Sequence, residues 1–234
     1  MVSEKTLELN VVAELLEYFR IFYSPKIFFR GLTLREEGVM GYDNSISLGS
    51  AEFTFFQFKA PKRRNPTTFY INNNKKNDQH NILYNLAYQA GPGVVFYAFP
   101  VFFSDFDMFA FSPQLLRNTY FMDISPIGLL SPKQHKVEVN IQNKTARVYY
   151  SKPKEFKLIS GEDITKVLYE RDYYKKQEAD PVFGLKFVNG ERLNRLLKEC
   201  FYSPENVPIS SKWIRCKSFV KINQEQQTLK QIVG

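Results

Sequence analysis

The chain is poor in the residues that build disulfide and zinc frameworks. It contains two cysteines, Cys200 and Cys216, and two histidines, His80 and His135, in 234 residues. A Pro-containing loop separates the cysteines and no histidine pair lies near them, so neither a disulfide framework nor a zinc site is predicted. Two thiols without a disulfide pattern indicate an intracellular protein.

The motifs of several large enzyme classes are also missing. The sequence has no Gly-rich phosphate loop, no Gly-x-Ser-x-Gly motif and no Cys–His nucleophile arrangement. It has no apolar run long enough to cross a bilayer, and no charged n-region followed by an apolar h-region at its start. We therefore expect a cytoplasmic chain with no membrane partner.

Positive charge is in excess. The chain has 32 Lys and Arg against 24 Asp and Glu, which gives a formal net charge of +8 and an isoelectric point of about 9.3. This balance favours polyanionic partners such as nucleic acid. Basic residues flank the segment after Lys59, where they can follow phosphates or belong to a solvated loop. These residues are Lys62, Arg63, Arg64, Lys75 and Lys76.

Two neighbouring segments are predicted to form a β-hairpin. Residues 45–48 alternate polar with apolar side chains, and residues 53–59 form an aromatic run of strand character. The pair Gly49-Ser50 between them supplies a turn. The sequence therefore predicts strand, turn and strand.

Three polar residues of this hairpin are predicted to share one site. Successive side chains of a strand face opposite sides, so Gln57 and Lys59 share a face. Pairing about the turn brings Asp43 within reach of Gln57. A carboxylate and an amide oxygen can bind a hard cation, and an ammonium can orient a water or neutralise charge on phosphorus. The alternative is a surface hairpin with a solvated lysine.

Asp43 followed by Gln57-Phe58-Lys59 resembles the motif of the PD-(D/E)xK nuclease superfamily, which has the restriction-endonuclease-like fold. In that superfamily an Asp on one strand precedes an acid-x-Lys on the next. The resemblance implies that Asp43 and Gln57 bind a metal ion and that Lys59 assists the attacking water. Gln57 stands where an acid is usual and Tyr42 where a Pro is usual, and the missing charge weakens metal binding.

The first helix is predicted over residues 5–20, because Leu7, Val11 and Leu15 recur at helical spacing. The resemblance implies that a Glu of this helix completes the metal site, and Glu14 is the better placed candidate. The alternative is a solvent-facing Glu on an amphipathic helix.

A second helix is predicted to follow the hairpin. Asp78 can cap it and Gly91 can end it. A crossing to an apolar strand at residues 94–99 would make the βαβ unit of a mixed sheet. Gln79 and His80 at the start of the helix can meet a phosphate. His80 can also relay a proton, or be a hydrogen-bonded surface residue.

The expected fold class is α/β, with a mixed central sheet flanked by helices as in a restriction-endonuclease-like core, followed by a C-terminal α+β extension. The core is expected over residues 1–125 and the extension over residues 126–234. The extension is predicted to contain a hairpin of residues 137–141 and 146–150, helices near 161–176 and 190–200, and an alternating basic and aromatic segment at 212–221. That segment suits a nucleic-acid strand or a protected edge strand.

These features predict a Mg²⁺- or Mn²⁺-dependent nuclease that cleaves DNA or RNA, in defence or in nucleic-acid processing. One alternative is a catalytically incomplete module that binds nucleic acid or assembles with partner proteins. A third hypothesis is a structural interaction protein whose 22 Phe and 14 Tyr supply partner surface. A protein partner or a homodimer is compatible with each hypothesis.

Overall fold

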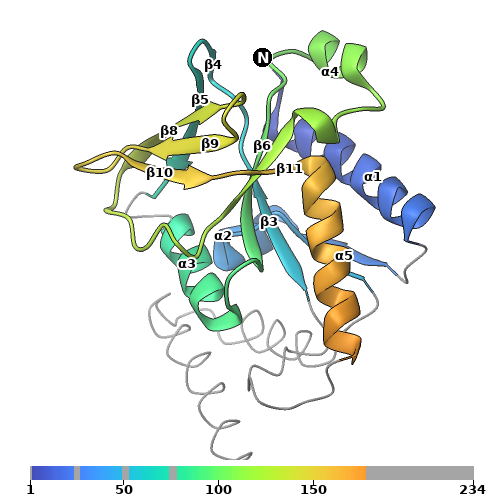
Figure 1. The fold of residues 1–234 in the computed structure, drawn as a ribbon. Coiled ribbons are helices and arrows are strands. Elements are labelled where there is room, and N and C mark those ends of the chain that lie inside the picture. Colours follow the sequence, from blue (N-terminus) through green and yellow to red (C-terminus); the bar gives the residue numbers. More distant parts are fainter. Residues whose placement is uncertain (1, 24–26, 49–52, 74–77, 178–234) are drawn as a thin grey trace, which may run out of the picture. The chain divides into compact units, whose positions relative to one another are not determined.

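The computed structural model describes residues 2–23, 27–48, 53–73 and 78–177 (Figure 1). Its first sheet has six strands in the order β1-β2-β3-β6-β7-β11. Strands β3 and β6 are parallel, and the other neighbours in this sheet are antiparallel. The strands are β1 (Phe28–Gly31), β2 (Asn44–Ser47), β3 (Thr54–Phe58), β6 (Val95–Pro100), β7 (Thr119–Asp123) and β11 (Ile159–Ser160). The mixed sheet confirms the α/β class.

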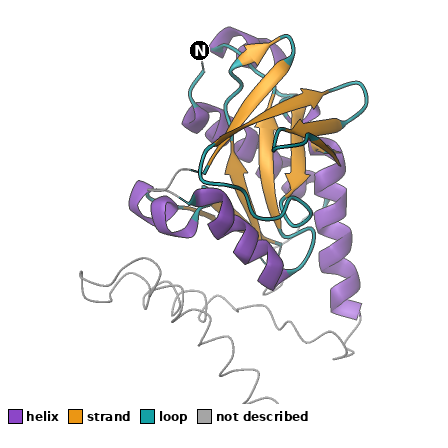
Figure 2. Ribbon diagram, turned by 90° about the vertical axis from the view of Figure 1, so that its left-hand side faces the viewer, coloured by secondary structure: helices purple, strands orange, loops and turns teal. Residues whose placement is uncertain are grey.

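Helices cover both faces of this sheet (Figure 2). Helices α1 (Glu4–Phe22) and α5 (Gly161–Gln177) pack together on one face. Helix α3 (Gln79–Ala90) lies on the other face against β6, and α2 (Leu34–Met40) contacts α3. Helix α3 provides the crossover that a parallel pair such as β3 and β6 requires, as the sequence predicts.

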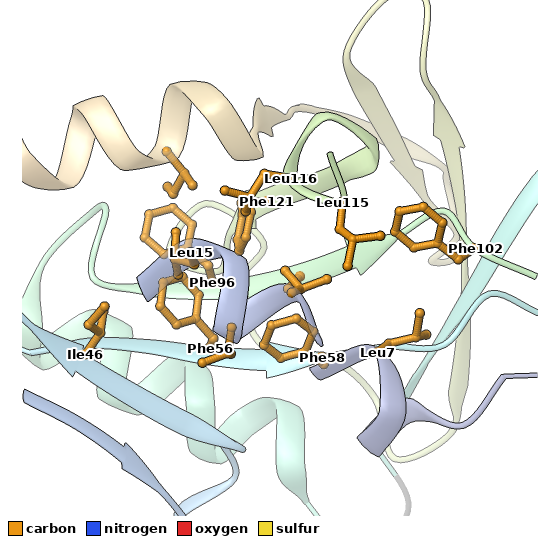
Figure 3. Close-up of a cluster of buried hydrophobic side chains, with 14 of the residues drawn as sticks. Leu7, Leu15, Ile46, Phe56, Phe58, Phe96, Phe102, Leu115, Leu116 and Phe121 are labelled. Atoms are coloured by element: carbon orange, nitrogen blue, oxygen red, sulfur yellow. The ribbon is translucent and has the colours of Figure 1, made fainter. Parts of the chain in front are cut away.

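The hydrophobic core under α1 determines which side chains of β3 point to the opposite face of the sheet. Phe56 and Phe58 of β3 are almost fully buried and lie beside Leu7 and Leu15 of α1 (Figure 3). Because side chains alternate along a strand, Gln57 must point to the opposite face, toward α3. Burial of large aromatic side chains stabilises this register by roughly 1.5–3 kcal/mol for each ring.

A second sheet combines strands from distant parts of the chain. It is antiparallel, in the order β10-β9-β8-β5-β4. The strands are β4 (Arg63–Arg64), β5 (Thr67–Asn72), β8 (Gln134–Asn140), β9 (Thr145–Val148) and β10 (Lys154–Lys157). The segment after Lys59 is therefore not a simple solvated loop, because Phe69 and Ile71 of β5 are buried.

This second sheet corrects the predicted boundary at residue 125. Strand β5 precedes that boundary and pairs with β8, which follows it. Strand β11 also follows the boundary, yet it pairs with β7 of the first sheet, and α5 packs on α1. The predicted hairpin and the helix near residues 161–176 are present as β8, β9 and α5. The helix predicted at 190–200 and the segment 212–221 lie outside the described residues.

Two short helices connect β6 to β7. Helix α4 (Asp105–Phe111) comes first, and the 3-10 helix η1 (Leu116–Asn118) follows it. Across the described ranges, none of the helices combines the length and the apolar character that a bilayer crossing needs.

Candidate active site

The backbone of Asp43 is held in place by the end of helix α2 and by pairing with β3. Helix α2 starts with a capping box of Thr33 and Glu36 and ends at Gly41, whose φ is 79°. A Cβ at Gly41 would lie 3.2 Å from the carbonyl oxygen of Gln79, so only glycine fits this close approach to α3. The chain then enters β2, and the Asp43 N–H donates to the Phe56 carbonyl at 2.9 Å.

The register places Asp43 across from Gln57. Asn44 of β2 pairs with Phe56 of β3 in the antiparallel ladder, so Asp43, just before β2, faces Gln57. Gln57 Nε2 donates to both carboxylate oxygens of Asp43, at 2.8 and 3.0 Å. The Phe58 N–H donates to Asp43 Oδ2 at 2.6 Å. The predicted contact between Asp43 and Gln57 is confirmed.

A chain of hydrogen bonds continues from Gln57 to Lys59. Gln79 Nε2 donates to Gln57 Oε1 at 2.8 Å, and Lys59 Nζ donates to Gln79 Oε1 at 3.3 Å. An ammonium can only donate and an ionised carboxylate can only accept, so the two ends determine how both amides are oriented. The predicted site residues Asp43, Gln57, Lys59 and Gln79 therefore form one network across β2, β3 and α3.

Burial raises the pKa of Asp43 to about 7, because an ionised carboxylate loses its hydration inside the protein. The Lys59 ammonium and the Phe58 N–H lower this pKa, and the negative charge of Glu4 raises it. Asp43 thus changes its protonation state near neutral pH, and a cation bound beside it would favour the ionised form.

Two further carboxylates lie beside Asp43. Glu8 of α1 and Glu37 of α2 each offer an oxygen, and these atoms and one from Asp43 lie within 4.8 Å of one another. Lys5 Nζ lies 2.9 Å from Glu8 Oε1 and 3.7 Å from Glu37 Oε1, and its side chain is half exposed. Burial raises the pKa of Glu37, while the Lys5 ammonium lowers it. Three acidic side chains, from α1, α2 and the residue before β2, therefore lie together.

Lys59 is buried at the end of β3. Its Nζ lies 3.6 Å from Glu4 Oε1, and the other oxygen of Glu4 accepts the Ala60 N–H at 3.2 Å. Glu4 therefore ties the first turn of α1 to the chain just after Lys59. Lys59 is thus paired with one amide oxygen and with one half-exposed carboxylate.

The structure corrects the role expected for Glu14. Its carboxylate accepts the N–H groups of Leu115 and Leu116, at 2.7 and 3.1 Å. These are unpaired donors at the start of a helix, which a carboxylate satisfies well. Glu14 therefore caps η1, and the glutamate of α1 that joins Asp43 is Glu8.

His80 also differs from its expected catalytic role. Its Nδ1 lies 2.9 Å from the Tyr97 hydroxyl and its Nε2 lies 2.8 Å from the Gly128 carbonyl. The carbonyl can only accept, so Nε2 carries the proton and Nδ1 accepts from Tyr97. Burial lowers the pKa of His80 to about 4. Because the ring is fully buried and both nitrogens are paired, it supports α3 and has no free site for a proton relay.

The structure describes three of the five basic residues predicted to contact nucleic acid. Lys62, Arg63 and Arg64 are exposed at β4. Arg64 Nη2 bonds Asp107 Oδ2 at 2.7 Å, and its guanidinium lies 4.8 Å from the centre of the Phe103 ring. The other two, Lys75 and Lys76, lie outside the described residues.

Four residues of the site were not predicted from the sequence, namely Glu8, Glu37, Lys5 and Glu4. Glu4 and Glu8 are four residues apart and so share a face of α1, which was a usable signal. Glu37 directly follows the capping-box residue of α2, a helix that was not predicted. Neither signal shows by itself that these carboxylates meet Asp43, because that depends on where the two helices cross the sheet.

Comparisons of the chain with protein-family models, with curated proteins and with solved structures find no match.

Proposed function

We propose that the protein is a divalent-cation-dependent nuclease that hydrolyses phosphodiester bonds in nucleic acid. One observation carries this proposal: the carboxylates of Asp43, Glu8 and Glu37 lie together, and a hydrogen-bond network joins Asp43 to the buried Lys59 on the adjacent strand. Acidic oxygens beside an ammonium suit a reaction in which a water attacks a phosphate. The resemblance of Asp43 and Gln57-Phe58-Lys59 to the PD-(D/E)xK motif points the same way.

The donor set fits Mg²⁺ or Mn²⁺. Carboxylate oxygens are the ligands that hard cations prefer. Opposite ligands of Mg²⁺ are about 4.2 Å apart, since each lies about 2.1 Å from the ion. The three oxygens lie within 4.8 Å of one another. At most one pair can be opposite, and the other pairs would have to approach to about 3.0 Å through side-chain rotation to share one ion. Asp43, Glu8 and Glu37 would hold it, with Lys5 moving aside on its half-exposed side chain.

A cation at these carboxylates would lower the pKa of a bound water and offset charge on the phosphate. The chain's own groups arrange the rest. Gln57 and the Phe58 N–H hold both oxygens of Asp43 in place. Lys59 orients the attacking water and stabilises negative charge that develops on the phosphate oxygens. Gln79 holds Lys59 in position through its amide oxygen.

A second candidate is a catalytically incomplete module that binds nucleic acid. The orientation of Gln57 favours it, because the amide offers its nitrogen and not its oxygen to Asp43. A neutral donor at this position satisfies the carboxylate without a metal ion. In such a module the site would be a structural element that joins β2, β3 and α3.

The two candidates are separated by cleavage assays on purified protein. End-labelled single- and double-stranded DNA and RNA are incubated with Mg²⁺, with Mn²⁺ and with EDTA. The nuclease proposal predicts fragments that form with a divalent cation and not with EDTA. Binding of the same oligonucleotides without cleavage under every cation condition would favour the incomplete module.

A further inference from the structure

Helix α4 presents aromatic rings to solvent. Phe106 and Phe109 are 77% and 79% exposed, and Phe111 is 50% exposed. Of the seven residues of α4, only Met108 is buried. Large exposed rings grouped on one short helix are unusual unless they meet a ligand or a partner.

Strand β4 supplies positive charge to the same surface. The ion pair of Arg64 with Asp107 and the position of its guanidinium over Phe103 join β4 to the start of α4. The side chains of Lys62 and Arg63 are exposed next to Arg64. We name this the α4–β4 surface and define it by its aromatic and basic side chains, namely Phe106, Phe109, Phe111, Lys62 and Arg64, because Arg63 alternates to the opposite face of β4.

We propose that the α4–β4 surface binds single-stranded nucleic acid. The exposed rings can stack on unpaired bases, and Lys62 can contact the phosphate between them. Arg64 is held in place by Asp107, so it adds a fixed planar cation beside Phe103. This inference rests on the proposed function, because the bound strand would be the substrate of the site at Asp43 and Lys59.

The surface lies close to that site along the chain. Lys62 follows Lys59 by three residues, and three residues span at most about 11 Å. The chain runs on from β3 of the first sheet to β4, an edge strand of the second sheet (Figure 1). Lys62 therefore joins this surface to the segment that carries Lys59.

A single strand fits this surface better than a duplex or a lipid surface does. Paired bases are stacked on each other and offer few free faces to an aromatic ring. An anionic membrane would require a broad basic face, yet Asp107 pairs with Arg64 and Asp105 adds a second acidic side chain to the first turn of α4. Since Arg64 is paired with Asp107, we expect the rings to supply most of the affinity, with about one phosphate contact and a log–log salt slope of about −0.7.

The test is equilibrium binding of the full chain to fluorescent oligo-dT, oligo-U and a DNA duplex in EDTA, where cleavage cannot occur. We expect tighter binding to both single strands than to the duplex. The double variant Phe106→Ala/Phe109→Ala should bind single strands at least about tenfold more weakly, because stacking on one ring contributes about 1–3 kcal/mol, or five- to 150-fold.

The matched control is Tyr88→Ala, which removes a 76% exposed ring from α3 and should leave binding unchanged. Circular dichroism and thermal unfolding show that each variant folds. Unchanged single-strand binding by the folded double variant overturns the inference, as does a preference for the duplex. Binding to vesicles of phosphatidylserine and phosphatidylcholine that the double variant loses, without single-strand binding, would assign the surface to lipid and also overturn it. The inference can fail while cation-dependent cleavage persists, and it can hold where the chain cleaves nothing.

Discussion

Gln57 Nε2 lies 2.8 Å from Asp43 Oδ1, so the side chain offers its amide nitrogen to the carboxylate and keeps its oxygen for Gln79. The resemblance to the PD-(D/E)xK motif implies that this position supplies a ligand oxygen. Gln57 can do so only if its amide turns over, and Gln79 must then turn as well and present its nitrogen to Lys59. As it stands, Gln57 positions Asp43.

The Gln57→Glu variant tests this relationship. A carboxylate at position 57 would add a charged oxygen ligand beside Asp43, so Mn²⁺ should bind at least about tenfold more tightly. Without the cation, two carboxylates would face each other in a buried site, which lowers stability at pH 8. Isothermal titration with Mn²⁺ measures the first effect, and urea unfolding in EDTA measures the second.

The control for this prediction is Gln79→Glu, which makes the same substitution one step further along the network, beside Lys59. It should leave Mn²⁺ affinity nearly unchanged. Equal Mn²⁺ affinity for the wild-type chain and Gln57→Glu would rule out a role for position 57 at the cation.

Asp43 makes the cation-free protein less stable as the pH rises. Its pKa is about 7 in the folded chain against an ordinary value of 3.8, so between these values the folded state binds more protons than the unfolded state. Stability from this group is therefore present below pH 3.8 and lost as the pH rises through 7. About three pKa units correspond to about 4 kcal/mol.

The Asp43→Asn variant should therefore be more stable than the wild-type chain at pH 8 in EDTA, by up to about 4 kcal/mol. The difference should shrink as the pH falls to 5, where Asp43 is protonated. Urea unfolding at the two pH values measures it. A variant that is less stable than the wild-type chain at pH 8 would show that the carboxylate charge is well compensated.

His80 has the opposite effect on stability. Its pKa falls from 6.5 to about 4 on folding, so its contribution is present above pH 6.5 and lost as the pH falls through 4. The shift of about 2.5 units corresponds to about 3 kcal/mol. In a His80→Gln variant, the free energy of unfolding should fall less between pH 6.5 and pH 4 than it does in the wild-type chain, because Gln does not titrate.

The same variant checks the assignment of His80 as a structural residue. Gln cannot replace both hydrogen bonds, so His80→Gln should be less stable at pH 7 but should retain any cleavage activity at a temperature where it is folded. Loss of cleavage by the folded variant would show that His80 takes part in the reaction.

Glu8 and Glu14 separate cation binding from helix capping. Glu8→Gln and Glu37→Gln each remove a charged oxygen beside Asp43, and we expect Mn²⁺ affinity to fall about tenfold or more. Glu14→Gln should lower the free energy of unfolding by about 1.5–3 kcal/mol, the usual value of hydrogen bonds to a charged group, and leave Mn²⁺ affinity unchanged. Weaker Mn²⁺ binding by a folded Glu14→Gln variant would place Glu14 at the cation after all.

The sequence was sufficient to predict the contact between Asp43 and Gln57, because it follows from local rules. Alternation in the first strand and an aromatic second strand indicate an antiparallel pair of neighbouring strands. The turn predicted at Gly49-Ser50 lies outside the described residues. The βαβ crossover was predictable for a similar reason, since Gly91 ends an apolar helix and a fully apolar strand follows.

Other features depend on contacts between distant segments. Glu8 and Glu37 meet Asp43 only because α1 and α2 approach β2 from different directions. Strand β5 has a visible alternation at Phe69 and Ile71, but its partner β8 begins more than 60 residues later. His80 looked like a surface cap because nothing nearby in the sequence indicates that Gly128 covers it.

The most direct measurement compares cleavage of a labelled single-stranded oligonucleotide in Mn²⁺ by the wild-type chain, Asp43→Asn and Lys59→Met. Circular dichroism and binding in EDTA provide the folding and binding controls for each variant. The account predicts cation-dependent cleavage by the wild-type chain and at least about a 100-fold lower rate for each variant, with binding nearly retained. Cleavage that continues undiminished in both folded variants would contradict the assignment of the site.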